Sequence, residues 1–249
     1  DYDPFMFMKI NNKAYGFTIT LIEYEETIPS LWDHTKQFMK LHPDYFASDN
    51  LVEFVIDNGD FETSNYNLCH FWSNFEIGDI NFFRSKQYKD YFEYLDKTGG
   101  FFYERWGDAP VHSIAASLFL NKSQVYHFKD IGYVHDGMGH CPLGEKQFHE
   151  NGKCDCNVVD SVTLLEDYCM GDWWFASREG RPPEREEYKA LIDELELEDV
   201  WIEEGEGEEG GQEDENAGDE NSEVFDRRHL KKHYSSALLR QKRRARMSQ

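Results

Sequence analysis

The order of apolar and polar residues predicts a folded α/β domain over residues 1–175. Large apolar side chains alternate with small or polar ones over residues 15–21, which is the period of a β-strand. Apolar residues then recur at helical spacing from 31 to 41, and Pro43 follows as a stop. Thr27 or Ser30 is the candidate N-cap of this helix.

Two further helices are expected in the middle of the chain. Ser85 is a candidate cap for the first, whose aromatic and aliphatic stripe runs from Tyr88 to Leu95 and ends at Gly99. The second follows Asp108, a residue type that favours the N-cap position. Before the first of these helices, the apolar run at residues 79–83 favours a strand.

The remaining pattern predicts two strands and a long loop. Residues 125–128 and 131–135 are short apolar runs typical of strands. Residues 136–172, rich in Gly, His and Cys, are expected to form a loop over the domain. Trp173, Trp174 and Phe175 are then expected as a last contact with the core.

The end of the chain differs in composition from the rest. Residues 176–202 are expected to be a linker followed by an acidic helix. Residues 203–249 are expected to be a disordered tail, first acidic and then basic. The reason is that the acidic stretch has almost no apolar side chains with which to form a core.

Composition narrows the classes of function. The 249 residues carry a formal net charge of −23, which argues against a general nucleic-acid binder because phosphates would be repelled. An acidic protein suits a divalent cation or a cationic ligand, although solubility is the commoner cause of such a charge. We therefore expect no nucleic-acid partner.

The sequence shows neither a membrane span nor a secretory leader. No run of about 18 apolar residues is present, and the first residue is Asp1 rather than Met. The first residues resemble the middle of a domain. We therefore expect the chain to be a fragment of a longer protein.

The five cysteines leave two interpretations open. Four of them, with two histidines, lie within residues 140–169, and the fifth is Cys69. A disulfide-stapled loop in an oxidising lumen is one interpretation, and a zinc site is the other. The pair Cys154 and Cys156 lacks the two-residue gap typical of zinc knuckles. The triplet at 121–123 is an N-glycosylation acceptor pattern.

The window from Tyr66 to Asp79 has the period of neither a helix nor a strand. It combines aromatic rings with an amide, a hydroxyl and two carboxylates, which are costly to bury without partners. Glu76, beside aromatic residues, suits a carboxylate that is held dry and aimed at a reaction centre. The alternative is an ordinary buried, paired acid in a core of aromatic residues.

Other candidate residues also have two interpretations. Glu26 closes an acidic run after the first strand, at the edge of a crevice or in a solvated turn. Arg105 stands just before a helix start, where it suits a phosphate. Asp108 is a cap or a site residue. His135 ends a strand, as a metal ligand or as a satisfied polar group.

Three motifs, in this order, closely resemble the fungal α-1,2-mannosyltransferase family, glycosyltransferase family 15. They are the window 66–79, the segment 102–113 and the segment 131–135, and the resemblance runs from residue 1 to about Cys169. The resemblance implies the C-terminal part of a catalytic domain. Its fold would be a glycosyltransferase-A-type mixed sheet flanked by helices, incomplete at the N-terminus.

The resemblance also implies a function. Family members transfer mannose from GDP-mannose to the 2-hydroxyl of a mannose acceptor on a glycoprotein or glycolipid, with retention of configuration. Mn²⁺ holds the diphosphate. They are Golgi membrane proteins with a luminal catalytic domain, so a membrane would be reached only through an anchor that this chain lacks.

Site residues can be carried over by motif. Glu76 matches the acid that serves as nucleophile or as the base facing the anomeric carbon. His135 matches the histidine ligand to manganese, a suitable role for imidazole. Glu26 matches an acceptor contact. Positions lining the donor–acceptor crevice are matched by Trp72, Arg105 and Asp108.

The family's second manganese-binding element, a Glu-Pro segment, is expected upstream of Asp1. We therefore expect this chain alone to bind GDP-mannose poorly. A non-catalytic mannoside-binding module, using the same aromatic crevice without turnover, is the main alternative. A zinc-binding acidic interaction protein is a third.

Overall fold

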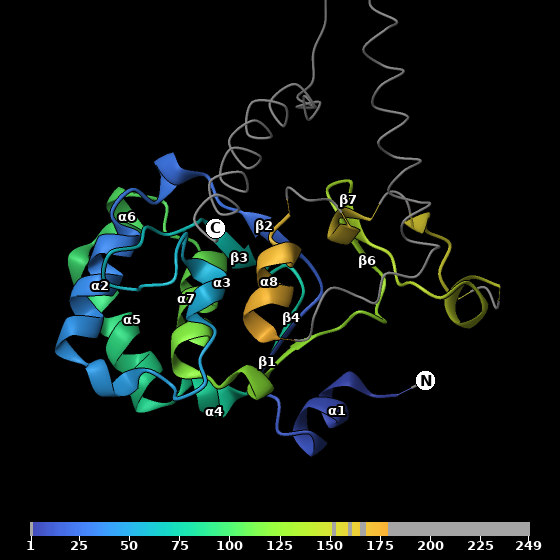
Figure 1. Ribbon diagram of the computed structural model, residues 1–249, viewed down its shortest axis with the longest axis horizontal. Helices are drawn as coiled ribbons and strands as arrows, with labels where there is room; N and C mark the ends of the chain where they lie inside the picture. Colours follow the sequence, from blue (N-terminus) through green and yellow to red (C-terminus); the bar gives the residue numbers. More distant parts are fainter. Residues whose placement is uncertain (1, 151–152, 159–160, 165–167, 179–249) are drawn as a thin grey trace, which may run out of the picture. The chain divides into compact units, whose positions relative to one another are not determined.

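The computed structural model describes residues 2–150, 153–158, 161–164 and 168–178 (Figure 1). They belong to one compact unit, Asp1–Arg185. The predicted acidic helix and the predicted tail lie outside the described residues, apart from the first three linker positions. Among the described residues, no helix is both long enough and apolar enough to span a bilayer.

A small mixed sheet forms the centre of this unit. Strand β1 (Tyr15–Phe17) lies between β4 (Glu76–Gly78) and β5 (Val125–His127), antiparallel to the first and parallel to the second. Strand β2 (Thr20–Ile22) pairs antiparallel with β3 (Cys69–Phe71). The strand predicted over 15–21 is therefore two short strands with different partners.

Helices surround these strands. In Figure 1, α2, α5 and α7 gather on one side of the strands, and the hairpin of β6 (Tyr133–His135) and β7 (Met138–His140) lies on the other. The α-helices are α1 (Pro4–Ile10), α2 (Leu31–Leu41), α3 (Val52–Val55), α4 (Ile80–Phe83), α5 (Lys86–Thr98), α6 (Gly100–Tyr103), α7 (Asp108–Phe119) and α8 (Met170–Ser177). Shorter helical turns are η1 (Glu25–Thr27), η2 (Pro43–Tyr45), η3 (Lys122–Gln124), η4 (Glu145–His149) and η6 (Val162–Leu164).

Most predicted helix boundaries are confirmed. Helix α2 begins after Ser30 and ends before Pro43, and Ser85 caps α5 by accepting a hydrogen bond from the amide of Tyr88. Gly99 ends α5 with φ 84°, a conformation that glycine adopts without strain.

The strand predicted over 79–83 is wrong. These residues form the short helix α4, because the Asp79 carboxylate accepts a hydrogen bond from the Asn81 amide at 2.8 Å and so caps a helical turn. Apolar content alone does not separate a short buried helix from a strand.

An aromatic cluster centred on Phe71 holds the strands to the helices. The Phe71 ring lies 4.3 Å from that of Phe17 and 4.6 Å from that of Phe54, between centroids. The indole of Trp173, fully buried in α8, meets Phe71 edge-on at 5.7 Å. This confirms the expected core contact for Trp173 and ties a late segment of the chain to the central sheet. Trp174 also packs against the core, whereas the contact expected for Phe175 is wrong because its side chain is 61% exposed.

Two disulfides add covalent links. Cys69 in β3 bonds Cys169 just before α8, and Cys141 after β7 bonds Cys156. Cys154 keeps a free thiol. The expected stapled loop is present, and the stretch predicted as a loop also contains strand β7.

Two buried histidines join the β6–β7 hairpin to the sheet. The rings of His127 and His140 lie 5.3 Å apart, and His127 Nε2 donates to the carbonyl of Thr18 at 3.1 Å. His140 Nδ1 lies 2.7 Å from the hydroxyl oxygen of Thr163. Burial lowers the pKa of His127 to about 3 and that of His140 to about 4.

These histidines predict an acid-sensitive stability. Their pKa values are lower in the folded chain than in the unfolded chain, so between about pH 6.5 and pH 4 the unfolded state binds more protons. The free energy of unfolding should fall by up to roughly 2 kcal/mol per histidine from pH 7 to pH 5. Urea unfolding at both values measures this, and His140→Gln should reduce the difference. An equal difference in variant and wild type would contradict the assignment.

The close approach of β1 to Phe128 gives a second prediction. A Cβ on Gly16 would meet the buried ring of Phe128 at 2.5 Å, whereas one on Gly171 in α8 would meet nothing within 4 Å. Gly16→Ala should destabilise the fold by about 1–3 kcal/mol. Gly171→Ala should stay within about 0.5 kcal/mol of wild type or be more stable. Denaturant unfolding compares the two, and equal effects would contradict the packing described.

Candidate active site

The carboxylate of Glu76 is held by two side chains from distant parts of the sequence. The hydroxyl of Tyr15 donates to Oε2 at 2.6 Å, and Nδ1 of His112 lies 3.1 Å from each carboxylate oxygen. The side chain of Glu76 is 23% exposed, so it is neither sealed in the core nor free in solvent. Its exposed part is available to a ligand.

Strand pairing explains the contact with Tyr15. In the β1–β4 register, Phe17 stands opposite Glu76 and Tyr15 stands opposite Gly78. Tyr15 is therefore the diagonal neighbour of Glu76 on the same face, a position that long side chains reach. The two groups meet because β1 and β4 are antiparallel.

Asp108 and His112 approach from the start of α7. Gly107, not Asp108, is the N-cap, and the Asp108 side chain makes no capping hydrogen bond. One ligand atom each from Glu76, Asp108 and His112 lie within 4.8 Å of one another. Asp108 and His112 are four residues apart, so they share one helix face. The capping role expected for Asp108 is wrong, and its exposed carboxylate lies beside Glu76 instead.

Buried neutral groups surround these carboxylates. Burial, followed by the charge of Glu76, raises the pKa of Tyr15 well above its usual value, and the same two causes raise the pKa of Tyr88. Burial lowers the pKa of His70 in β3 to about 4, with Asp108 opposing the shift. At neutral pH both tyrosines keep their protons, so Tyr15 can act only as the donor in its bond with the carboxylate.

The rings of Trp72 and His135 contact each other. Their ring centroids lie 5.1 Å apart, edge to face, and Phe75 contacts Tyr133 of the same hairpin strand at 5.4 Å. The segment leading into Glu76 therefore packs along β6, which ends at the exposed His135. None of the three-ligand groups among the described residues includes His135. The described chain thus offers His135 as a single ligand.

Arg105 and Glu26 lie on adjoining segments. The amide of Arg105 donates to the carbonyl of Thr27 at 2.8 Å, and Glu26 belongs to the same short turn, η1, as Thr27. Both side chains are exposed. The charge of Arg105 also opposes the rise in the pKa of Glu23 that burial causes. The structure therefore links these two predicted residues to each other.

Sequence reasoning missed Tyr15 and His112. Tyr15 was counted only as a large residue in an alternating strand, and nothing local distinguishes it from a core tyrosine. His112 had a detectable signal, because it stands four residues after Asp108 in a predicted helix. Two polar side chains one turn apart at the start of a helix lie on the same helix face, and this pattern indicates a candidate functional site.

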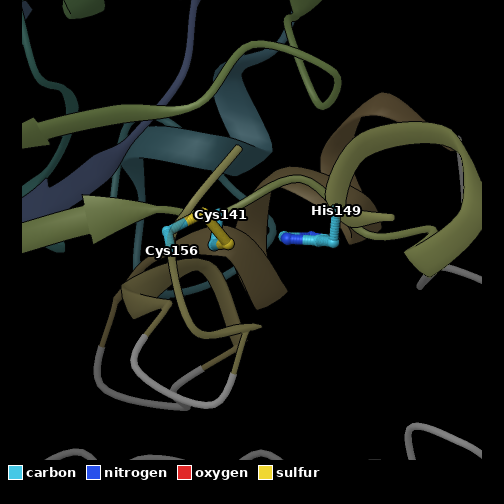
Figure 2. Close-up of side chains that lie close together, drawn as sticks. All are labelled: Cys141, His149 and Cys156. Atoms are coloured by element: carbon cyan, nitrogen blue, oxygen red, sulfur yellow. A yellow bond between two sulfur atoms is a disulfide. The ribbon is translucent and has the colours of Figure 1, made fainter. Parts of the chain in front are cut away.

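The cysteine–histidine cluster does not support a zinc site (Figure 2). Cys141, His149 and Cys156 lie close together, but the two sulfurs are joined in a disulfide and offer no thiolate. His149 Nε2 donates to the carbonyl of Pro142 at 2.9 Å. Cys69 and Cys169, near Asp172, are likewise bonded to each other. The zinc interpretation is therefore wrong for these clusters.

Known proteins resemble this chain throughout the residues that the structure describes. The family described as "Glycolipid 2-alpha-mannosyltransferase" matches residues 1–178. O-glycoside alpha-1,2-mannosyltransferase omh1 of Schizosaccharomyces pombe is 53% identical over 176 residues, 71% of this chain and 44% of that protein. Alpha-1,2 mannosyltransferase KTR1 of Saccharomyces cerevisiae is 53% identical over 182 residues, 73% of this chain and 45% of that protein.

Solved structures give the same result. Core-mannan synthase A (CmsA/Ktr4) from Aspergillus fumigatus, in a Mn/GDP form, matches with a TM-score of 0.62 at 41% identity, over 71% of this chain and 48% of that one. Ktr4p from S. cerevisiae in complex with GDP matches with a TM-score of 0.62 at 38% identity, over 74% and 48%. The fold is the predicted glycosyltransferase-A-type mixed sheet flanked by helices.

The chain spans less than half the length of these curated relatives. The match nevertheless covers most of the described residues, including every predicted site residue. The chain belongs to the glycolipid 2-alpha-mannosyltransferase family, glycosyltransferase family 15, which its three motifs resemble.

Proposed function

We propose that this chain forms the acceptor-side part of a retaining α-1,2-mannosyltransferase. The enzyme moves mannose from GDP-mannose to a mannose acceptor on a glycoprotein or glycolipid. The observation that carries the proposal is the partly exposed Glu76 carboxylate, fixed by Tyr15 and His112 and placed beside Asp108. The place of the chain in a family of mannosyltransferases supports the choice of reaction.

Glu76 supplies the charge that the reaction requires. Breaking the bond between mannose and phosphate builds positive charge on the sugar and negative charge on the departing GDP. A carboxylate fixed at the sugar face stabilises the positive charge. Retention uses either a carboxylate bonded transiently to the anomeric carbon or attack from the side of the leaving group. Both routes place Glu76 next to the anomeric carbon.

His135 is the proposed ligand for Mn²⁺. Imidazole is a suitable ligand for this ion, and His135 is exposed at the end of β6 with its ring against Trp72. When bound, the cation neutralises charge on the diphosphate. This side chain supplies one ligand, so the donor and metal site is completed from outside the described residues. The two solved relatives that hold GDP, one of them in a Mn/GDP form, support the choice of manganese and of a GDP-linked donor.

The remaining predicted residues would orient the two sugars. Trp72 offers an aromatic face beside His135, and Asp108 offers an acceptor oxygen beside Glu76. Glu26 and Arg105, on adjoining segments, provide an exposed carboxylate and guanidinium for hydroxyls or phosphate. We place the acceptor mannose along these groups.

We also propose that the protein works in the Golgi lumen, where a membrane anchor holds it. The two disulfides support an oxidising compartment. The rival function is a mannoside-binding module without turnover. Because relatives are more than twice as long as the matched segment, we expect the 249 residues alone to bind GDP-mannose poorly.

The test joins this chain to the N-terminal half of the A. fumigatus relative. Mannose transfer from GDP-mannose to α-methyl mannoside is then measured with Mn²⁺ present. We expect transfer by the joined protein and little or none by the 249 residues alone. Glu76→Gln should lower transfer at least about 100-fold while GDP binding persists, because the amide keeps the shape but not the charge.

The matched control is Glu62→Gln, an exposed acid whose side chain lies near Lys40 rather than at the site. It should transfer mannose as the parent does. A joined protein that binds α-methyl mannoside without any transfer would favour the binding module. Full transfer by Glu76→Gln would contradict the catalytic role, and transfer by the 249 residues alone would contradict the incomplete donor site.

A further inference from the structure

We infer that Tyr15 and His112 are positioning residues for Glu76: Tyr15 bonds Oε2 alone, His112 contacts both oxygens, and Oε1 is left as the oxygen that faces the sugar. The inference rests on the proposed function, because it assigns an orientation to the carboxylate of that site. It adds two positioning residues to the proposed site and assigns a role to one carboxylate oxygen of Glu76. Neither residue was among the candidates that the sequence motifs supplied.

The two carboxylate oxygens differ in their hydrogen bonds. Oε2 accepts from the Tyr15 hydroxyl at 2.6 Å and also lies 3.1 Å from His112 Nδ1. Within the part of the chain that the structure describes, Oε1 has only the shared contact with His112, at 3.1 Å. A hydrogen bond to a charged oxygen draws electron density from it, so Oε2 is the stabilised end. Oε1 keeps more of its basicity and has the freer lone pairs.

Tyr15 is suited to be a fixed donor. Its side chain is fully buried, and its backbone is set by pairing with β4 on one side and β5 on the other. Its ring lies 5.4 Å from Phe71 of the aromatic cluster. The hydroxyl therefore has one well-defined position. A donor that is rigid before the reaction needs no reorganisation during it.

His112 fixes the plane of the carboxylate. Ionised Glu76 is only an acceptor, so Nδ1 of His112 must carry the proton in this contact. The imidazole is itself held between rings, 5.0 Å from Phe83 and 6.0 Å from Tyr88. Its equal distances to the two oxygens oppose rotation of the carboxylate about its last bond. Together with Tyr15, it selects one orientation.

Cation binding is the competing role for the same atoms. Ligand atoms from Glu76, Asp108 and His112 lie close enough together to surround an ion. However, Nδ1 cannot bind a cation and carry a proton at the same time. The protonation of that nitrogen therefore separates positioning from cation binding through Nδ1, and a cation bound through Nε2 would leave this proton in place.

The first experiment detects the proton on His112 Nδ1 directly. ¹⁵N-histidine NMR of the 249-residue chain at pH 7 should show His112 protonated at Nδ1, with a slowly exchanging proton. Added Mg²⁺ should leave the signal unchanged, and Glu76→Ala should abolish the slow exchange. An unprotonated Nδ1, or loss of its proton on adding Mg²⁺, would overturn the inference. This result does not depend on catalysis.

The second experiment measures kinetics in the joined protein described above. Tyr15→Phe and His112→Ala should each lower kcat about 10- to 100-fold, the scale for a misplaced reactive group, with KM for GDP-mannose little changed. His112→Asn places an amide N–H near the position of Nδ1 and should recover at least about tenfold of the loss.

The matched control is Tyr91→Phe. Tyr91 is also fully buried, and its hydroxyl lies 2.8 Å from that of Thr35, away from Glu76. It should lower the melting temperature but leave kcat near that of the parent. Equal kcat for Tyr15→Phe and Tyr91→Phe would overturn the positioning role. Unchanged transfer by Glu76→Gln would instead overturn the proposed function, whatever the NMR result.

Discussion

The antiparallel pairing of β1 with β4 is the constraint on which the candidate site depends. It sets Tyr15 diagonal to Glu76, so that a buried hydroxyl meets a carboxylate from a segment about sixty residues away. A shift of one residue in this register would turn Glu76 to the opposite face. The sheet has only three strands, so the pairing also depends on what is packed around it.

That support comes from both ends of the chain. The ring of Phe71 joins β3 to Phe17 in β1, to Phe54 in α3 and to Trp173 in α8. The disulfide between Cys69 and Cys169 fixes the same two regions covalently, closing a loop of about 100 residues. Because Glu76 follows β3 closely in sequence, a rigid β3 also limits where Glu76 can lie. Stability and site geometry therefore rest on the same contacts.

Sequence alone predicted the local features well. Helix α5 was framed by Ser85 and Gly99, and α2 by Ser30 and Pro43, because caps and stops act within a few residues. Glu76 was singled out from its aromatic surroundings and its motif, and the structure shows its carboxylate partly exposed and held by Tyr15 and His112, while its catalytic role stays a prediction. The motifs matched Asp108 to a crevice-lining position, and its place before a helix also predicted a cap, which is wrong because Gly107 is the N-cap.

Features that depend on distant pairing were not predicted. Predicting the contact of Tyr15 with Glu76 requires the strand register. Predicting the partner of Cys69 requires the path of the 100 residues that separate it from Cys169. The break between β1 and β2 arises because the two halves pair with different strands. A short apolar run such as 80–83 forms a helix or a strand according to one capping carboxylate. The roles of all the predicted site residues stay predictions: Glu76, Glu26, Trp72, Arg105, Asp108 and His135.

The central claim is that Glu76 and His135 serve one sugar-nucleotide site. A crystal structure of the joined protein with Mn²⁺ and a non-transferable GDP-mannose analogue tests it most directly. The account predicts Glu76 Oε1 within about 3.5 Å of the anomeric carbon, with His135 bound to the cation on the diphosphate. Mannose bound away from Glu76, or a cation site without His135, would contradict it.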